Sequence, residues 1–194
     1  MSTNQPLLAK NDDLRTPHWV YSPLGQIDLD PCAGIETDIA QVNWAIERGQ
    51  CGLTQNWKGF VYCNPPFSQK EIWSEKMIQH GNGLLLLPER GSAPWFTHIV
   101  KHCKDHWVMG KKINFEGGSS SNNVGSVIFA FGQEAIDRLI YSGLPGHLNH
   151  IGLVRERVTK LTTTPNRPTL DLRQPNLAHG FSRPIQLVCK MAAL

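Results

Sequence analysis

Four consecutive leucines, at positions 84–87, are the feature that most restricts how this chain can fold. They stand between Gly83 and Pro88, and an apolar run of this length is typical of a strand buried on both faces. Such a strand belongs to a largely parallel sheet with helices on both sides. The run is also far shorter than the ~20 apolar residues that a membrane-spanning helix needs. Because the polar segment 1–13 lacks the apolar core of a secretion signal, we expect a soluble, cytoplasmic protein without membrane association.

The rest of the chain up to residue 150 alternates strand patterns with helical patterns. Further strands are predicted at 25–31, 59–63 and 124–131, and helices at 69–80, from Pro94 through Trp107, and at 133–142. This alternation predicts a three-layer α/β fold with a mostly parallel sheet. Residues 116–123 are rich in Gly and Ser, which predicts a flexible loop. We therefore predict one domain over residues 1–150.

Residues 151–194 differ from this domain in pattern and in charge. They carry seven Lys and Arg against two Asp and Glu, whereas residues 1–150 carry twelve against fourteen. After residue 160 prolines interrupt any periodicity, so this segment is predicted to be a basic C-terminal extension rather than a second domain. An excess of positive charge suits a polyanionic partner, and a solvated tail without a partner remains the alternative.

Two unusual clusters follow predicted strands, where open α/β sheets bind their ligands. The first is Asp30-Pro-Cys-Ala-Gly34, whose small residues would let a ligand approach the backbone and whose carboxylate could accept hydrogen bonds. An ordinary Asp-Pro turn would explain the same residues.

The second cluster is Asn64-Pro-Pro-Phe-Ser68. The two prolines fix φ and remove two backbone donors, leaving carbonyl groups that point outward beside the side-chain carbonyl of Asn64. A rigid set of acceptors next to the ring of Phe67 suits a planar group that carries an exocyclic NH2. A proline-rich loop with a buried Phe is the structural alternative.

Together these motifs resemble the phage-encoded DNA N6-adenine methyltransferase (Dam-type) family. The resemblance extends from about residue 12 to 132. It rests on Thr16-Pro17, Asp28-Leu-Asp-Pro-Cys-Ala33, Gly52-Leu53, Trp57-x-Gly59, Asn64-Pro-Pro-Phe-Ser68, Leu86-Leu-Pro88, Trp95-Phe96 and Gly110-Lys-Lys-Ile-x-Phe115. It implies the three-layer, Rossmann-like fold of S-adenosylmethionine-dependent methyltransferases. Only 33 residues separate Asp30 from Asn64, about the length of one βαβ unit, so the fold must be abbreviated there.

The resemblance also implies a role for each matching residue. Asn64 and the Pro65 carbonyl would accept hydrogen bonds from the N6 amine of adenine, and Phe67 would stack on a base flipped out of duplex DNA. The implied catalytic residues are Asn64, Pro65, Pro66 and Phe67, and those around S-adenosylmethionine are Thr16, Pro17, Asp30, Pro31, Cys32 and Ala33. This methyl donor is already activated, so the reaction requires no metal.

Two assignments are less direct. The family usually has an acidic residue before Gly52-Leu53, where this chain has Cys51. Glu47 is our candidate for the cofactor's ribose, and a surface carboxylate without a ligand is the alternative. Arg90, Lys111 and Lys112 are candidate DNA contacts. The alternative for Arg90 is an ion pair with Glu89 at the rim, and for the two lysines it is a surface position without a partner. His98, His102 and His106 recur at helical spacing, which we interpret as a solvated helix face rather than a metal site.

The resemblance predicts a phage- or prophage-encoded enzyme acting in the bacterial host cytoplasm on a short DNA site, and it indicates no oligomeric state. Two alternatives remain open. A methyltransferase acting on a protein glutamine would meet the same NH2 geometry. A phage protein that binds DNA without catalysis, with a degenerate cofactor site, would explain Cys51.

Overall fold

A computed structural model of the chain describes residues 14–103, 105–117 and 124–150. They form an α/β fold around one seven-stranded sheet in the order β2-β1-β3-β4-β6-β5-β7. The strands are β1 (Leu29–Asp30), β2 (Val42–Asn43), β3 (Val61–Cys63), β4 (Gly83–Pro88), β5 (Asp105–Met109), β6 (Ser126–Phe131) and β7 (Gly146–His150). The α-helices are α1 (His18–Tyr21), α2 (Lys70–His80), α3 (Pro94–His102) and α4 (Gln133–Tyr141). Short 3-10 helices cover Ser22–Leu24, Ile46–Arg48 and Phe67–Gln69.

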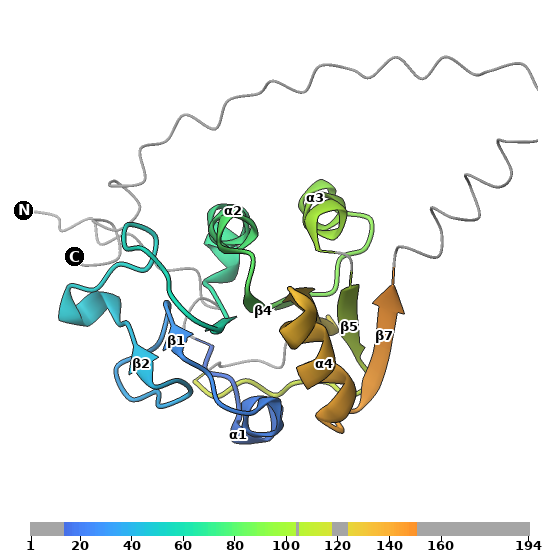
Figure 1. Cartoon of the computed structure of the whole chain (residues 1–194), viewed down its shortest axis with the longest axis horizontal. Helices are drawn as coiled ribbons and strands as arrows, with labels where there is room; N and C mark the ends of the chain where they lie inside the picture. Colours follow the sequence, from blue (N-terminus) through green and yellow to red (C-terminus); the bar gives the residue numbers. More distant parts are fainter. Residues whose placement is uncertain (1–13, 104, 118–123, 151–194) are drawn as a thin grey trace, which may run out of the picture.

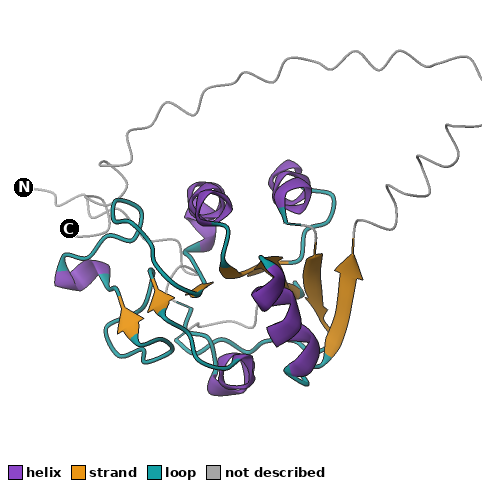
Figure 2. Cartoon of the chain, viewed as in Figure 1, coloured by secondary structure: helices purple, strands orange, loops and turns teal. Residues whose placement is uncertain are grey.

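Helices lie on both sides of the sheet, which gives the three layers that the sequence predicts (Figure 1). Helices α2 and α3 run side by side over one face, and α1 and α4 lie over the other (Figure 2). The apolar core is correspondingly divided into two clusters. One contains Trp73 and Met77 of α2 and Ile99 of α3. The other contains Val20 of α1 and Leu139 of α4.

Strand β4 confirms the prediction drawn from the four leucines. All four are fully buried. Because side chains alternate along a strand, Leu85 and Leu87 pack under α2 and α3, and Leu84 and Leu86 pack on the opposite side. One leucine run therefore supplies the centre of both core layers.

The sheet is mixed, so the prediction of a mostly parallel sheet holds only in part. Strands β2, β1, β3 and β4 pair in parallel, but β6 enters antiparallel between β4 and β5, and β7 pairs antiparallel with β5. Three of the six pairings are thus antiparallel. The sequence pattern of β6 could not reveal this, because a strand buried on both faces has the same composition in either direction.

The predicted helix from Pro94 through Trp107 is too long. Helix α3 ends at His102, and Cys103 adopts an extended conformation that leads directly into β5. Trp107 sits at helical spacing from Cys103, but it belongs to the strand and packs on the face opposite to that of Ile99. His106 is therefore a strand residue, and it is not on one helix face with His98 and His102. Strands β2, β5 and β7 were not predicted.

The segment between β1 and β3 is abbreviated, as expected. It contains two residues of β2 and the 3-10 helix Ile46–Arg48, with no α-helix between Asp30 and Val61. Residues 118–123 of the predicted loop, and the whole predicted extension 151–194, lie outside the described residues. Among the described helices none is long and apolar enough to cross a membrane.

Candidate active site

A cavity of about 220 Å³ opens where β1 and β3 end. The chain leaves β1 for β2 on one side and later returns to β3 on the other, so the strand order reverses at this point. Ligands of open α/β sheets bind in the crevice that forms at such a reversal. Both predicted strand-end clusters contribute to the cavity wall, the first with Asp30 and Cys32 and the second with Asn64 and Pro66.

Asp30 is a buried carboxylate at the centre of this wall. Its Oδ1 accepts hydrogen bonds from the backbone N–H of Cys32 (3.1 Å) and from the Cys32 thiol (3.6 Å). Burial raises the pKa of Asp30 to about 7, although the hydrogen bonds from Cys32 lower it. The carboxyl group can therefore bind a cation, and loss of its proton near neutral pH would charge the pocket.

The thiols of Cys32 and Cys63 join the two strand ends, with their sulfur atoms 3.4 Å apart. Burial is the main reason that the pKa of both thiols is raised. A raised pKa keeps both thiols protonated and poorly nucleophilic. Their role in this arrangement is to pack the strand ends together rather than to attack a substrate.

Asn64 presents an acceptor that has no partner among the described residues. Its Nδ2 donates to the backbone carbonyl of Leu14 at 2.7 Å, which fixes the orientation of the amide. Its Oδ1 is buried and has no hydrogen-bond partner in the described chain. A buried acceptor without a donor is costly, so this atom suits a ligand that donates a hydrogen bond.

The two prolines behave differently. Pro65 is buried behind the cavity, and Pro66 lies in its wall. The Pro66 carbonyl accepts from the backbone N–H of Gln69 at 2.9 Å, at the start of the 3-10 helix Phe67–Gln69. The expectation that both proline carbonyls point outward unpaired is therefore wrong for Pro66.

Phe67 does not line the cavity but packs edge-to-face against Phe115, with ring centroids 6.1 Å apart. The segment that carries Phe115 is anchored by a backbone bridge between Arg15 and Glu116. Phe115 was quoted in the sequence motif, yet no role was predicted for it. The contact with Phe67 places a second aromatic ring beside the predicted base-stacking residue.

Thr16 closes the cavity beyond Asn64. It is buried, lines the wall, and accepts from the phenol of Tyr62 at 3.1 Å. Pro17 is buried next to it and caps α1, outside the cavity wall. Thr16 therefore reaches the predicted pocket directly, whereas Pro17 only supports it.

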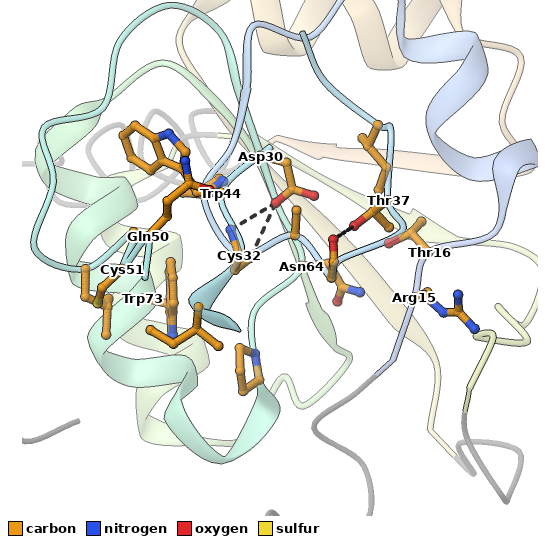
Figure 3. A pocket seen from close by; sticks show the side chains of 18 of the residues that line it. Arg15, Thr16, Asp30, Cys32, Thr37, Trp44, Gln50, Cys51, Asn64 and Trp73 are labelled. Carbon is orange, nitrogen blue, oxygen red and sulfur yellow. Dashed lines mark hydrogen bonds between the residues drawn. The ribbon is translucent and has the colours of Figure 1, made fainter. Parts of the chain in front are cut away.

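The far side of the cavity is built by the segment after β2 and by α2. Glu47, the predicted ribose ligand, lines this side together with Trp44, Ile46, Gln50, Cys51, Leu53 and Trp73; its role there stays a prediction. Figure 3 shows Trp44, Gln50, Cys51 and Trp73 on one side of Asp30 and Cys32, and Asn64, Thr16 and Thr37 on the other. One side of the cavity thus combines aromatic and apolar side chains with Glu47 and Gln50, and the other carries the hydroxyl groups of Thr16 and Thr37 and the amide of Asn64.

Two motif glycines allow this close packing. A Cβ on Gly52 would lie 2.1 Å from the carbonyl oxygen of Pro31, so only glycine lets the two walls approach. Gly59 has φ +72°, and a Cβ there would lie 2.3 Å from Asp28 Oδ2, which accepts from the Phe60 N–H. Gly52 thus shapes the pocket from within its wall, and Gly59 does so from outside it.

The predicted DNA contacts lie outside the cavity wall. Arg90 is exposed two residues after the end of β4. Lys111 and Lys112 are exposed after β5, and the Lys111 ammonium lies 5.2 Å from the ring centroid of Trp19. All three follow the carboxyl ends of β4 or β5, which lie at the same edge of the sheet as the cavity. Their role in DNA binding stays a prediction.

Sequence patterns missed several wall residues. Trp44, Gln50 and Trp73 had no recognisable motif, and Trp73 was assigned only to a helix. A signal existed for Trp73, because a large aromatic residue on the helix after the proline pair must face the strand ends. In the described ranges, no group of three or more His, Cys, Asp or Glu residues is arranged to hold a metal ion.

Two known proteins are similar to this chain in sequence. The chain is 28% identical over 149 residues to a DNA N-6-adenine-methyltransferase of Escherichia phage T1, covering 70% of this chain and 61% of that protein. It is 30% identical over 117 residues to a DNA N-6-adenine-methyltransferase of Haemophilus phage HP1, covering 54% of this chain and 66% of that protein. The chain therefore spans less than two thirds of the length of these relatives. No solved structure matches it.

The model of one family, described as DNA N-6-adenine-methyltransferase (Dam), matches residues 3–143. This range contains both strand-end clusters, every residue of the cavity wall and all described strands except β7. Because the match covers well over half of the chain and agrees with the sequence motifs, the chain belongs to the DNA N-6-adenine-methyltransferase (Dam) family.

Proposed function

We propose that this protein transfers a methyl group from S-adenosylmethionine to the exocyclic N6 amine of adenine in duplex DNA. The observation that carries the proposal is the buried Oδ1 of Asn64, which has no donor among the described residues although Nδ2 is held by Leu14. An amine that donates one hydrogen bond to this oxygen would satisfy it. The family and the names of the two phage relatives support adenine as the source of that amine.

The pocket also fits the cofactor. S-adenosylmethionine carries a zwitterionic amino-acid end with an ammonium group, a sulfonium centre and a flat purine, and it supplies an activated methyl group when bound. The buried carboxylate of Asp30 would bind the ammonium group, and its pKa of about 7 means that it is substantially ionised at neutral pH. Thr16 would close over the amino-acid end, Pro31, Cys32 and Ala33 would line the middle, and Glu47 would reach the ribose.

In the proposed mechanism, Asn64 positions the nucleophile. Asn64 Oδ1 and the Pro65 carbonyl would accept the two amine hydrogens, which orients the nitrogen lone pair towards the methyl group. The N6 amine in a base stack is inaccessible, so the adenine must be flipped out and would then stack on Phe67. Catalysis would come from positioning and from preorganised acceptors rather than from a covalent enzyme intermediate.

The test is a methylation assay on defined duplexes. The purified full chain is incubated with S-adenosylmethionine carrying a labelled methyl group, and the DNA is digested to nucleosides. Label in N6-methyladenine supports the proposal, and mapping the modified adenines gives the DNA site. Label in methylcytosine, or in glutamine of an added peptide, would replace it with another substrate. Binding of DNA without cofactor binding would instead support the non-catalytic alternative.

A further inference from the structure

Two tryptophans stack beside the far end of the pocket, and their indole nitrogens differ. The rings of Trp57 and Trp73 have centroids 6.3 Å apart and an interplanar angle of 28°. Trp57 Nε1 donates a hydrogen bond of 2.8 Å to the carbonyl of Gly52. Trp73 Nε1 is buried and has no acceptor within the described part of the chain. One indole is thus used by the fold, and the other is not.

This difference follows the position of each ring relative to the cavity. Trp73 is 6% exposed and lines the wall, whereas Trp57 stands behind it and is not a lining residue. An indole nitrogen can only donate, and a buried donor without an acceptor costs free energy. The described residues contain two indole nitrogens without an acceptor, those of Trp73 and Trp107, and only Trp73 lines the cavity. Its position in the wall points to a ligand atom as the missing acceptor.

The surroundings of Trp73 indicate which part of a ligand lies there. Trp73 shares its end of the cavity with Trp44, Gln50 and Cys51, across Asp30 and Cys32 from Asn64 (Figure 3). Ile46 and Leu53 complete this end with apolar surface. Since Asn64 receives the methyl acceptor, the adenosyl part of the cofactor extends in the opposite direction. A flat purine with ring nitrogens as acceptors matches the lining residues Trp44 and Trp73 and the aliphatic side chains better than the charged amino-acid end does.

We propose that Trp73 is a cofactor-binding residue whose indole N–H donates a hydrogen bond to a ring nitrogen of the purine of S-adenosylmethionine. The inference rests on the proposed cofactor and adds a residue for which neither the motifs nor the family match provides a role. Trp57 is the matched control, because it stacks on Trp73 but donates its indole N–H to the carbonyl of Gly52.

The first experiment measures binding, not activity. S-adenosylhomocysteine is titrated calorimetrically into the unsubstituted chain, into Trp73→Phe and into Trp57→Phe. Phenylalanine keeps an aromatic ring but removes the donor. Loss of a single neutral hydrogen bond predicts that Trp73→Phe weakens binding about threefold to tenfold. Trp57→Phe should change the dissociation constant by less than about twofold, because the Trp57 indole N–H bonds to the Gly52 carbonyl and not to the ligand. Loss of that hydrogen bond should instead lower the melting temperature.

The second experiment observes the indole proton itself, so it does not depend on a variant that folds well. In a ¹H–¹⁵N spectrum the Trp73 indole resonance is identified by its absence from Trp73→Phe. Addition of S-adenosylhomocysteine should move this resonance downfield, as expected for a newly hydrogen-bonded N–H, and leave that of Trp57 in place. The 1-, 3- and 7-deaza analogues of S-adenosylhomocysteine each lack one ring nitrogen of the purine. The analogue that lacks the acceptor of Trp73 should bind the unsubstituted chain about threefold to tenfold more weakly than the parent compound does. The same analogue should bind Trp73→Phe as tightly as the parent compound binds that variant.

The outcomes separate this inference from the proposed function. If S-adenosylhomocysteine binds normally to Trp73→Phe and the Trp73 resonance does not move, the inference is wrong and the proposed function stands. Trp73→Phe could also weaken the binding of the parent compound and of all three deaza analogues by the same factor. In that case the substitution has disturbed packing rather than a hydrogen bond, and the inference is again wrong. If the unsubstituted chain binds no S-adenosylhomocysteine, both are wrong.

Discussion

The two halves of the sheet are built differently. Strands β1, β2 and β3 have two or three residues each, whereas β4, β5, β6 and β7 have five or six. The short half pairs in parallel and ends at the cavity, and the long half pairs antiparallel around β6. Short strands turn early into loops, which leaves side chains such as Asp30 and Asn64 at the cavity.

The two halves should therefore contribute differently to stability and to function. β6 is buried along its whole length and is flanked by the buried β4, so this half supplies most of the continuous core. At the cavity, the short half contains the buried carboxylate of Asp30 and the orphaned acceptor of Asn64, both of which are unfavourable in the absence of a ligand. The buried carboxylate of Asp105 in the long half is instead paired with His150. Substitutions in the short half should therefore change function more than stability, and those in the long half the reverse.

The largest effect is expected at Asn64. Asn64→Ala removes the acceptor Oδ1, and loss of one preorganised transition-state hydrogen bond typically lowers turnover about 10²- to 10³-fold. The melting temperature and the affinity for S-adenosylmethionine should stay close to those of the unsubstituted chain. Steady-state methylation, a thermal melt and a binding titration measure the three quantities.

The matched variant Asn64→Asp keeps an acceptor at the same position and should retain more activity than Asn64→Ala. Full activity of Asn64→Ala would remove the basis for assigning the amine site to the end of β3.

Phe129 in β6 provides the opposite case. It is fully buried, and its ring packs on that of Phe96 with centroids 5.0 Å apart. Phe129→Ala leaves a cavity in the core and should lower the free energy of unfolding by about 3–5 kcal/mol. Denaturant unfolding measures this loss, and cofactor affinity at low temperature should change little.

Tyr141→Ala is the control for Phe129→Ala, since Tyr141 is 86% exposed and its loss should stay within about 0.5 kcal/mol. Equal effects of the two substitutions would contradict the placement of Phe129 in a packed core.

Asp30 should link the stability of the short half to pH. Its pKa of about 7 in the folded chain lies above the ordinary value of 3.8, so the folded state binds its proton more tightly than the unfolded state. The free energy of unfolding should therefore fall as pH rises from about 4 to about 7, by about 4 kcal/mol at most, and this contribution should level off above that range. Asp30→Asn should remove this slope and be more stable than the unsubstituted chain at pH 8.

The same substitution should weaken S-adenosylmethionine binding, because it removes the carboxylate proposed to hold the ammonium group. It should do so more strongly than Glu47→Gln, since Glu47 lies in the wall without a comparable set of fixed hydrogen bonds. A pH-independent difference in stability between Asp30→Asn and the unsubstituted chain would show that the carboxyl group titrates as it does in water.

The sequence predicted the short half well where a motif stood at a strand end. Asp30, Cys32, Asn64 and Pro66 follow distinctive turn residues, so their convergence on one cavity follows from adjacent parallel strands. Glu47 was placed in the wall only by elimination, yet it does line the cavity. Motifs report local backbone geometry, which is why they identify the ends of strands.

The sequence predicted the long half less well, because its arrangement depends on contacts between distant residues. The helical spacing of Phe96, Ile99 and Cys103 happens to continue at Trp107, but pairing with β6 and β7 converts that residue into part of a strand. Partly exposed β7 has no continuous apolar run that marks it. Trp73 was missed for the same reason, since its role depends on which wall α2 covers.

The smallest expected effect concerns the boundary between the halves. Arg90 is exposed two residues beyond the end of β4, at the same edge of the sheet as the cavity, and is a predicted phosphate contact. Arg90→Ala should weaken DNA binding and make the slope of log affinity against log salt shallower by about 0.9, the value for one phosphate contact on B-DNA. Cofactor affinity should not change, because Arg90 is outside the cavity wall.

Lys58→Ala is the matched control, since Lys58 is also exposed but precedes β3 and so lies at the opposite edge of the sheet. DNA titrations at several salt concentrations compare the two variants. Equal slopes for Arg90→Ala and the unsubstituted chain would move the DNA surface away from β4, and a change only in Lys58→Ala would place it at the opposite edge.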